Sequence, residues 1–321
     1  MASSPDSAEV VLEAVGLRRA FGDLAAVDGV DLRIAAGEAY GLLGPNGAGK
    51  TTTISMLCGL LEPDAGVVRV AGSDLATEPA AAKSAIGYVP QEIALYPDLT
   101  ARENLAFFGR LYGLRGRALA RRIDAVLEVI GLAPRADDRV GTYSGGMKRR
   151  VNIGAGLLHE PRLVVLDEPT VGVDPQSRHA ILESVAALSA EGTAILYTSH
   201  YMEEVERLCE RVGIIDHGRM IAEGTRRGLL AELGEADRLD LVVDGDAEGV
   251  AEACRGLAGV VDAAVAEREV TLLVRDGRAR LAEVVATVAS AGATLTSVEL
   301  VEPDLEAVFL SLTGRALRDD G

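Results

Sequence analysis

One glycine-rich segment constrains this chain more than any other feature. Residues 44–51 read Gly-Pro-Asn-Gly-Ala-Gly-Lys-Thr and fit the pattern G-x-x-x-x-G-K-[ST]. In such a loop the backbone N–H groups surround phosphate oxygens at the start of a helix. Lys50 is placed to neutralise β- and γ-phosphate oxygens, and Thr51 to offer a hydroxyl to Mg²⁺. The predicted phosphate-binding residues are Gly44, Pro45, Asn46, Gly47, Ala48, Gly49, Lys50, Thr51 and Thr52.

The surrounding segments have the strand–loop–helix pattern that this motif requires. An apolar run at 39–43 precedes the loop, and residues 51–61 carry apolar side chains at helical spacing. Thr100 and Glu103 form a capping-box pattern ahead of a helix-rich region. Further short strands are predicted near residues 10–12, 30–34, 67–70, 86–89, 163–166 and 193–197. The pattern favours a mixed α/β core with a helical subdomain at about 92–160.

Polar side chains follow three of these predicted strands. Asp167 and Glu168 end one apolar run, and we expect Asp167 to organise Mg²⁺ with Thr51 while Glu168 polarises the attacking water. Gln91 follows another strand and is placed to coordinate the metal or the water. His200 ends a third and is placed to hydrogen-bond the γ-phosphate. The predicted catalytic residues are Glu168, His200 and Gln91, and the predicted metal ligands are Thr51, Gln91 and Asp167.

Composition excludes several classes of partner and site. The formal net charge of -17 disfavours binding to nucleic acid or to anionic lipid. Basic clusters such as Lys148-Arg149-Arg150 are therefore expected to be solvated helix faces. Cys58, Cys209 and Cys254 lie far apart, so neither a disulfide framework nor a zinc site is predicted.

The sequence also predicts how the chain relates to a membrane. It contains neither a signal-peptide pattern nor an apolar run long enough to span a bilayer. Any membrane role would then depend on docking to another polypeptide. We expect the chain to be soluble when isolated.

The C-terminal part has a different pattern. Predicted strands and helices alternate in the order βαββαβ, which suggests a small ferredoxin-like α+β domain. We therefore expect a flexible tail at 1–8, an ATP-binding domain at 9–225 and an accessory domain at 235–321. Three roles are open for this accessory domain. It holds two copies of the chain together, regulates the ATPase, or only stabilises the ATP-binding domain. Its six elements are predicted at 239–243, 248–257, 260–265, 270–274, 279–291 and 295–300, followed by a helix at 305–312.

Together these residues resemble the ATP-binding cassette of ABC transporters. The resemblance covers about 10–225 and rests on Phe21, the glycine-rich loop, Gln91, the signature segment Tyr143-Ser144-Gly145-Gly146-Met147, the run ending at Asp167-Glu168-Pro169, Asp174 and His200. It implies a head-to-tail homodimer in which ATP lies between the loop of one copy and Ser144, Gly145 and Gly146 of the other. It also implies that Phe21 stacks on adenine, that Asp174 bridges the two sites and that Gln91 links hydrolysis to a membrane partner.

Two departures from the common signature narrow the resemblance. Tyr143 replaces the usual Leu and Met147 the usual Gln, as in a subgroup that pairs with ABC-2 type permeases. The C-terminal segment from Glu302 to Arg315 is similar to that of daunorubicin-resistance exporter ATPases. The resemblance implies an ATPase that energises a separate permease from the cytoplasmic side of the membrane, as a peripheral protein bound through that permease. It points to export of a hydrophobic compound such as a drug or antibiotic, while sodium, lipid and polysaccharide exporters have closely similar ATPases.

Two alternatives stay open beside export. One is a soluble ABC ATPase acting on a non-transport complex, although the second cassette, the long coiled coil and the zinc cysteines of such proteins are missing from the sequence. The other is a nucleotide sensor without turnover, which the presence of Glu168 disfavours. The aromatic residues Phe107, Phe108 and Tyr112 either contact a partner or fill the helical core, and their helical spacing is more typical of core residues. We expect the permease to dock near Gln91 and the segment Tyr96 to Tyr112.

Overall fold

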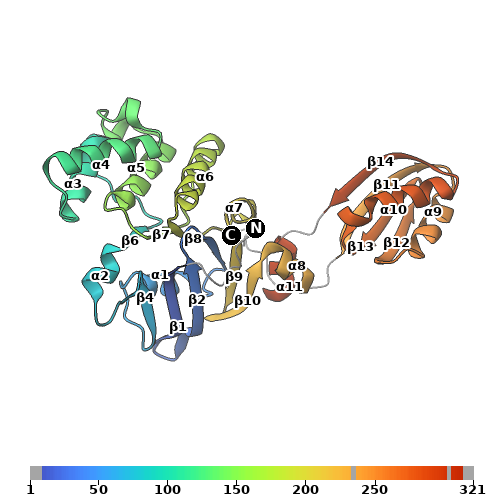
Figure 1. Cartoon of the computed structure of the whole chain (residues 1–321), viewed down its shortest axis with the longest axis horizontal. Helices are drawn as coiled ribbons and strands as arrows, with labels where there is room; N and C mark the ends of the chain where they lie inside the picture. The colour runs from blue at the N-terminus through green and yellow to red at the C-terminus, as the bar shows by residue number, and fades with distance from the viewer. Residues whose placement is uncertain (1–8, 233–235, 302–304, 314–321) are drawn as a thin grey trace. The chain divides into compact units, whose positions relative to one another are not determined.

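The computed structural model describes residues 9–232, 236–301 and 305–313. Contacts divide the chain into two compact units, one formed by Met1–Thr225 with Leu312–Gly321 and the other by Arg226–Ser311 (Figure 1). The tail predicted at 1–8 and part of the segment from Glu302 to Arg315 lie outside the described residues. Within the described ranges, no helix is both long and apolar enough to cross a bilayer.

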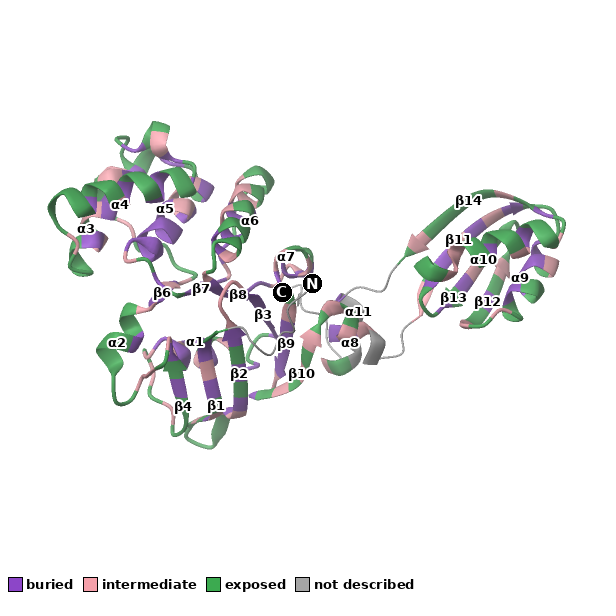
Figure 2. Cartoon of the chain, in the orientation of Figure 1, coloured by how far each residue is buried: buried purple, intermediate pink, exposed green. Residues whose placement is uncertain are grey.

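A parallel sheet forms the centre of the first unit. Its strand order is β10-β9-β3-β8-β7-β6, and all neighbours are parallel except β9 and β10. Every residue of β3, β7 and β8 is buried, as expected for strands covered on both faces (Figure 2). Because the chain direction is shared, the loops that follow β3, β6, β7 and β8 meet at one edge. The strands are β3 (Ala39–Leu43), β6 (Ile86–Val89), β7 (Leu163–Asp167), β8 (Ala194–Thr198), β9 (Arg211–Asp216) and β10 (Arg219–Thr225).

A second, antiparallel sheet belongs to the same unit. Its order is β2-β1-β4-β5. Phe21 pairs with Leu24 at the end of the β1–β2 hairpin, where Gly22 turns the chain with a φ of 60°. Both strands of this hairpin extend well beyond the apolar runs that predicted them. The strands are β1 (Val10–Phe21), β2 (Leu24–Ala35), β4 (Ala65–Val70) and β5 (Ser73–Asp74).

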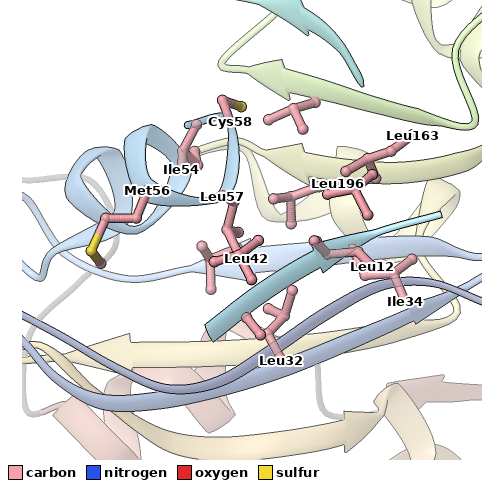
Figure 3. Packing of buried hydrophobic residues seen from close by; sticks show 14 of the residues in the cluster. Leu12, Leu32, Ile34, Leu42, Ile54, Met56, Leu57, Cys58, Leu163 and Leu196 are labelled. Atoms are coloured by element: carbon pink, nitrogen blue, oxygen red, sulfur yellow. The ribbon is translucent and has the colours of Figure 1, made fainter. Parts of the chain in front are cut away.

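The hydrophobic core joins both sheets to the first helix, α1 (Lys50–Leu57). Leu32 and Ile34 of β2 and Leu42 of β3 are at most 2% exposed. Figure 3 shows the side chains of Ile54 and Leu57 in α1 among the same buried residues. The helix that starts at the phosphate loop is therefore anchored by packing.

The region predicted to be helix-rich contains three packed helices. α3, α4 and α5 contact one another (Figure 1). The predicted capping box is present, since Glu103 N donates to Thr100 Oγ1 at 3.1 Å and Thr100 N donates to Glu103 Oε2 at 2.8 Å. The helices of this region are α3 (Ala101–Leu111), α4 (Gly116–Val129), α5 (Gly145–Leu157) and the short 3₁₀ turns η2 (Ala133–Arg135) and η3 (Val140–Thr142). The other helices of the unit are α2 (Pro79–Ser84), α6 (Pro175–Ala190) and α7 (Met202–Leu208).

Helix α5 packs directly against the parallel sheet. A Cβ atom on Gly87 of β6 would lie 2.3 Å from the carbonyl oxygen of Gly156, so only glycine permits this approach. Arg149 of α5 is 2% exposed. The prediction that Lys148-Arg149-Arg150 is a solvated face is therefore wrong for Arg149.

The aromatic residues of α3 and Tyr112, which follows that helix, are more exposed than the core interpretation predicts. Phe107 is 36% exposed and Tyr112 is 45% exposed, while Phe108 is half-buried. The Tyr112 ring stacks on His159 with 3.8 Å between ring centroids. The interpretation that this stripe fills the core is wrong for Phe107 and Tyr112.

The second unit has the element order predicted from its sequence. Its sheet order is β12-β13-β11-β14, and every pair is antiparallel. Leu239, Leu241 and Val243 alternate with less buried residues along β11 and form its core with α9 and α10. The elements are β11 (Asp237–Asp244), α9 (Ala247–Arg255), β12 (Val260–Ala266), β13 (Glu269–Val274), α10 (Gly277–Ser290) and β14 (Thr294–Val301), with α8 (Arg226–Glu232) before and α11 (Leu305–Thr313) after them in sequence. Its assignment to the ferredoxin-like class stays a prediction.

We expect Leu42→Ala to lower the free energy of unfolding of the first unit by about 2–5 kcal/mol, because it leaves a cavity among fully buried neighbours. Leu60 is 63% exposed, so Leu60→Ala should change the same quantity by less than about 0.5 kcal/mol. Urea denaturation of both variants measures the difference. Equal shifts in the two variants would contradict the core assignment.

Candidate nucleotide site

The glycine-rich loop connects β3 to α1 in the conformation that its glycines permit. Gly47 and Gly49 have φ values of 79° and 103°, in the left-handed region. A Cβ atom on Gly49 would lie 2.4 Å from Ala26 O, so a side chain is also excluded by space. Lys50 Nζ donates to Gly44 O at 2.5 Å and to Pro45 O at 3.1 Å. These bonds fold the lysine back along the loop, and burial lowers the pKa of its ammonium.

A cleft of about 830 Å³ opens beside this loop. The structure brings together in its wall most of the residues predicted to bind ATP or to react with it. These are Phe21, Pro45, Asn46, Gly47, Ala48, Gly49, Lys50, Thr51, Thr52, Gln91, Asp167, Glu168 and His200.

Asp167 is the last residue of β7 and is buried. Thr198 Oγ1, on the neighbouring strand β8, donates a hydrogen bond to Asp167 Oδ1 at 2.8 Å. Burial raises the pKa of the Asp167 carboxyl, and this hydrogen bond opposes the rise. The side chain is thus held in a partly desolvated position in the lining of the cleft.

Glu168 follows with an unusual backbone. Its φ is 46°, which is uncommon for a residue with a side chain, and its N–H donates to Thr198 O at 3.2 Å and to Thr198 Oγ1 at 3.0 Å. Strain of this kind persists where surrounding bonds enforce it and is frequent at functional sites. Here it directs the Glu168 side chain into the cleft wall.

The side chains that follow two further strands both approach one carboxylate oxygen of Glu168. Gln91 Nε2 donates to Glu168 Oε2 at 3.1 Å, and His200 Nδ1 lies 3.5 Å from that oxygen. These three residues follow β6, β7 and β8. The parallel sheet therefore assembles a glutamate, an amide and an imidazole beside the phosphate loop.

The cleft also contains residues that the sequence motifs did not indicate. Leu24, Ala25 and Ala26 continue the wall from Phe21, which is 50% exposed. His217 and Gly218 contribute from the β9–β10 turn. A Cβ atom on Gly218 would lie 2.8 Å from Ala26 O, so the turn approaches β2 closely. The His-Gly pair is an ordinary turn signal, and only the fold places it at the cleft. Tyr201 completes the additional lining.

The remaining predicted residues do not line the cleft. Gly44, the first residue of the loop, does not line the cleft, and its carbonyl accepts a hydrogen bond from Lys50. Ser144 caps α5 by accepting from Met147 N at 3.3 Å, and Asp174 caps α6 by accepting from Ser177 N at 2.9 Å. Gly145 and Gly146 form the first turn of α5. Within one chain, the signature segment and Asp174 are thus separate from the phosphate loop's cleft.

Comparisons with known proteins agree with this arrangement. The family model described as ABC transporter matches residues 27–171. The linearmycin resistance ATP-binding protein of Bacillus subtilis (strain 168) is 51% identical over 96% of this chain and 100% of its own length. A daunorubicin resistance ATP-binding protein of Streptomyces coeruleorubidus is 42% identical over 96% of this chain and 97% of its own length. A solved ATP binding subunit of an ABC transporter is 34% identical, with a TM-score of 0.64 over 70% of this chain and 93% of that one.

This chain belongs to the ABC transporter family. It is an ATP-hydrolysing subunit of that family, and the predicted resemblance to daunorubicin-resistance ATPases is confirmed. The predicted α/β class with a mixed-sheet core is also confirmed. No finding favours the alternative of an ABC ATPase that acts on a non-transport complex.

We expect Lys50→Gln to weaken ATP binding by about tenfold to a hundredfold. A charge-assisted hydrogen bond to phosphate contributes roughly 1.5–3 kcal/mol, and 1.4 kcal/mol corresponds to about tenfold in affinity. Isothermal titration calorimetry of the two proteins measures the change. Lys83→Gln is the matched control, because Lys83 is exposed and does not line the cleft. Equal affinities for parent and Lys50→Gln would contradict the assignment.

Proposed function

We propose that this ATPase powers the export of a small molecule through a separate membrane permease of the ABC-2 type. The observation that carries the proposal is the match over nearly the whole chain, second unit included, to resistance ATP-binding proteins. Those relatives are named for resistance to linearmycin and to daunorubicin. For this chain the corresponding proposal is drug or antibiotic efflux from a position on the cytoplasmic side of the membrane.

Within the cleft, Glu168 acts as the general base. Its Oε2 is the atom to which Gln91 donates and beside which His200 lies, so a water bound there is oriented by all three side chains. His200 is placed to hydrogen-bond the γ-phosphate, and Phe21 to stack on adenine. Lys50 and the loop N–H groups stabilise the charge on the transferring phosphoryl group.

The oxygen donors of the cleft fit Mg²⁺. This ion is usually held by one or two protein oxygens together with substrate phosphates and water. Thr51 offers a hydroxyl, Gln91 an amide oxygen and Asp167 a desolvated carboxylate, and all three line the same cleft. When bound, the ion would neutralise developing charge on the phosphates.

A head-to-tail dimer completes the site. Ser144, Gly145 and Gly146 begin a helix, and such a position binds anions. These residues do not line their own chain's cleft, so a second copy would supply them. Asp174, at the start of α6, would then lie at the junction between the copies.

The permease docks on the apolar surface of the helical region, a name we give to the exposed residues Ile93, Tyr96, Phe107, Leu111 and Tyr112. Leu111 is 69% exposed, and the rings of Tyr96 and Phe107 pack edge to face with centroids 4.9 Å apart. Exposed apolar clusters of this kind are typical of protein contacts. The same segment continues from Gln91, which gives a short path between the docked partner and the base.

We expect Glu168→Gln to lower ATP turnover by about a hundredfold or more while ATP binding is retained, because the amide cannot accept a proton from water. Steady-state turnover and calorimetry of the same preparations separate the two effects. Glu128→Gln, which alters an exposed carboxylate on α4, should turn over ATP at the parental rate. Turnover that survives in Glu168→Gln would overturn the general-base role.

We expect a stoichiometric multi-span protein to accompany this chain when it is isolated from native membranes under mild detergent. Leu111→Glu should lose that protein, because a charge then occupies the apolar surface. Leu60→Glu places the same charge at another exposed leucine and should retain it. Mass spectrometry of the three preparations gives the result. Ribosomal, chromosomal or repair proteins in place of a permease would overturn the export proposal.

A further inference from the structure

Arg149 is a buried cation that donates hydrogen bonds to the backbone at the ends of β6 and β7, next to Gln91 and Glu168. It lies on α5, the helix that begins with Gly145 and Gly146 of the signature segment. A guanidinium carries five N–H donors in a rigid planar fork and has no acceptor. All five donors are used here, and each one meets a backbone carbonyl. Nε bonds Pro169 O at 2.8 Å, Nη1 bonds Pro90 O at 2.7 Å and Gln91 O at 2.8 Å, and Nη2 bonds Asp167 O at 3.0 Å and Glu168 O at 2.9 Å.

The accepting carbonyls belong to two separate segments. One follows β6 and contains Gln91, and the other ends β7 and contains Glu168. The side chains of these two residues meet at 3.1 Å. A single guanidinium therefore fixes the backbone on both sides of that contact and ties both segments to the signature helix.

Burial of a charge in this way is costly, and so the arrangement needs a physical reason. Desolvation lowers the pKa of Arg149, and the negative charge of Asp167 opposes that effect. The carbonyl bonds offset the desolvation because charge-assisted hydrogen bonds are strong in a buried site. Arg122 shows how the chain holds α5 elsewhere, since its donors reach Leu157 O and Leu158 O at the other end of that helix. Attachment of α5 alone does not require contact with the catalytic segments.

We propose that Arg149 is a positioning residue for ATP hydrolysis. It holds the backbones of Gln91 and Glu168 in a fixed relation to each other and to the helix of the signature segment. This inference rests on the proposed roles of Gln91 and Glu168. In a head-to-tail dimer, the helix that contacts one nucleotide would then set the position of the base at the other.

The test compares Arg149→Gln and Arg149→Lys with the parent and with Arg122→Gln. Arg122 lies on α4 and does not line the cleft. Arg122→Gln therefore removes guanidinium bonds to the carbonyls at the far end of α5 and leaves the cleft residues unchanged. We expect kcat for ATP to fall about tenfold to a hundredfold in Arg149→Gln, since small misplacements of reacting groups have effects of that size. The KM and the ATP affinity should stay within about threefold of the parental values. Lysine has three donors on a flexible stem, so Arg149→Lys should not restore the rate.

Amide hydrogen exchange supplies a readout that does not depend on turnover. We expect faster exchange in Arg149→Gln within the peptides covering residues 86–93 and 163–171, and parental exchange there in Arg122→Gln. Parental kcat together with parental exchange in Arg149→Gln would overturn the proposal. Equal losses of kcat in Arg149→Gln and Arg122→Gln would also overturn it, because they would reduce Arg149 to an attachment of α5. Should the parent itself fail to hydrolyse ATP, the functional assignment would fail, while the exchange comparison would still decide whether Arg149 holds the two segments.

Discussion

The shared direction of β3, β6, β7 and β8 is the constraint on which this ATPase depends. Parallel strands present their carboxyl ends at one edge, so four segments that are distant in sequence meet there. The phosphate loop follows β3, and Gln91, Glu168 and His200 follow the other three. Reversal of any one of these strands would place its polar end at the opposite edge of the sheet.

Several groups at that edge are individually unfavourable. Asp167 is desolvated, Glu168 has a left-handed backbone and Arg149 is a buried cation. They persist because neighbouring bonds restrain each of them, and because a core shared by two sheets and α1 supplies the stability that such features remove. Bonds within the chain therefore hold these charged and polar groups in place, and such preorganisation limits the reorganisation required during hydrolysis.

Strong local patterns predicted the strands β3, β7 and β8, although β9 of the same sheet and the helix α6 were not predicted. The apolar runs at 39–43 and 163–166 have no polar interruption, and both became central strands. β10 escaped prediction because it is an edge strand with alternating exposure and no apolar run. α2 is a short helix of six residues, too short to show a helical period. β1 and β2 extend beyond their apolar centres because they pair with each other, and pairing is a long-range property that a local window does not contain.

The sequence by itself determined the phosphate loop, the strand-end residues and the family, because each depends on residue types at a fixed local spacing. It also indicated Ser144 and Asp174, although it could not show that they are separate from the cleft of their own chain. Tertiary structure alone decided that Phe107 and Tyr112 lie at the surface and that His217 joins the cleft wall. It also decided that Arg149 is buried against the ends of β6 and β7, while its neighbour Lys148 is not buried. Burial depends on which elements pack together, and the sequence around Arg149 is the same whether that face of α5 contacts solvent or the sheet.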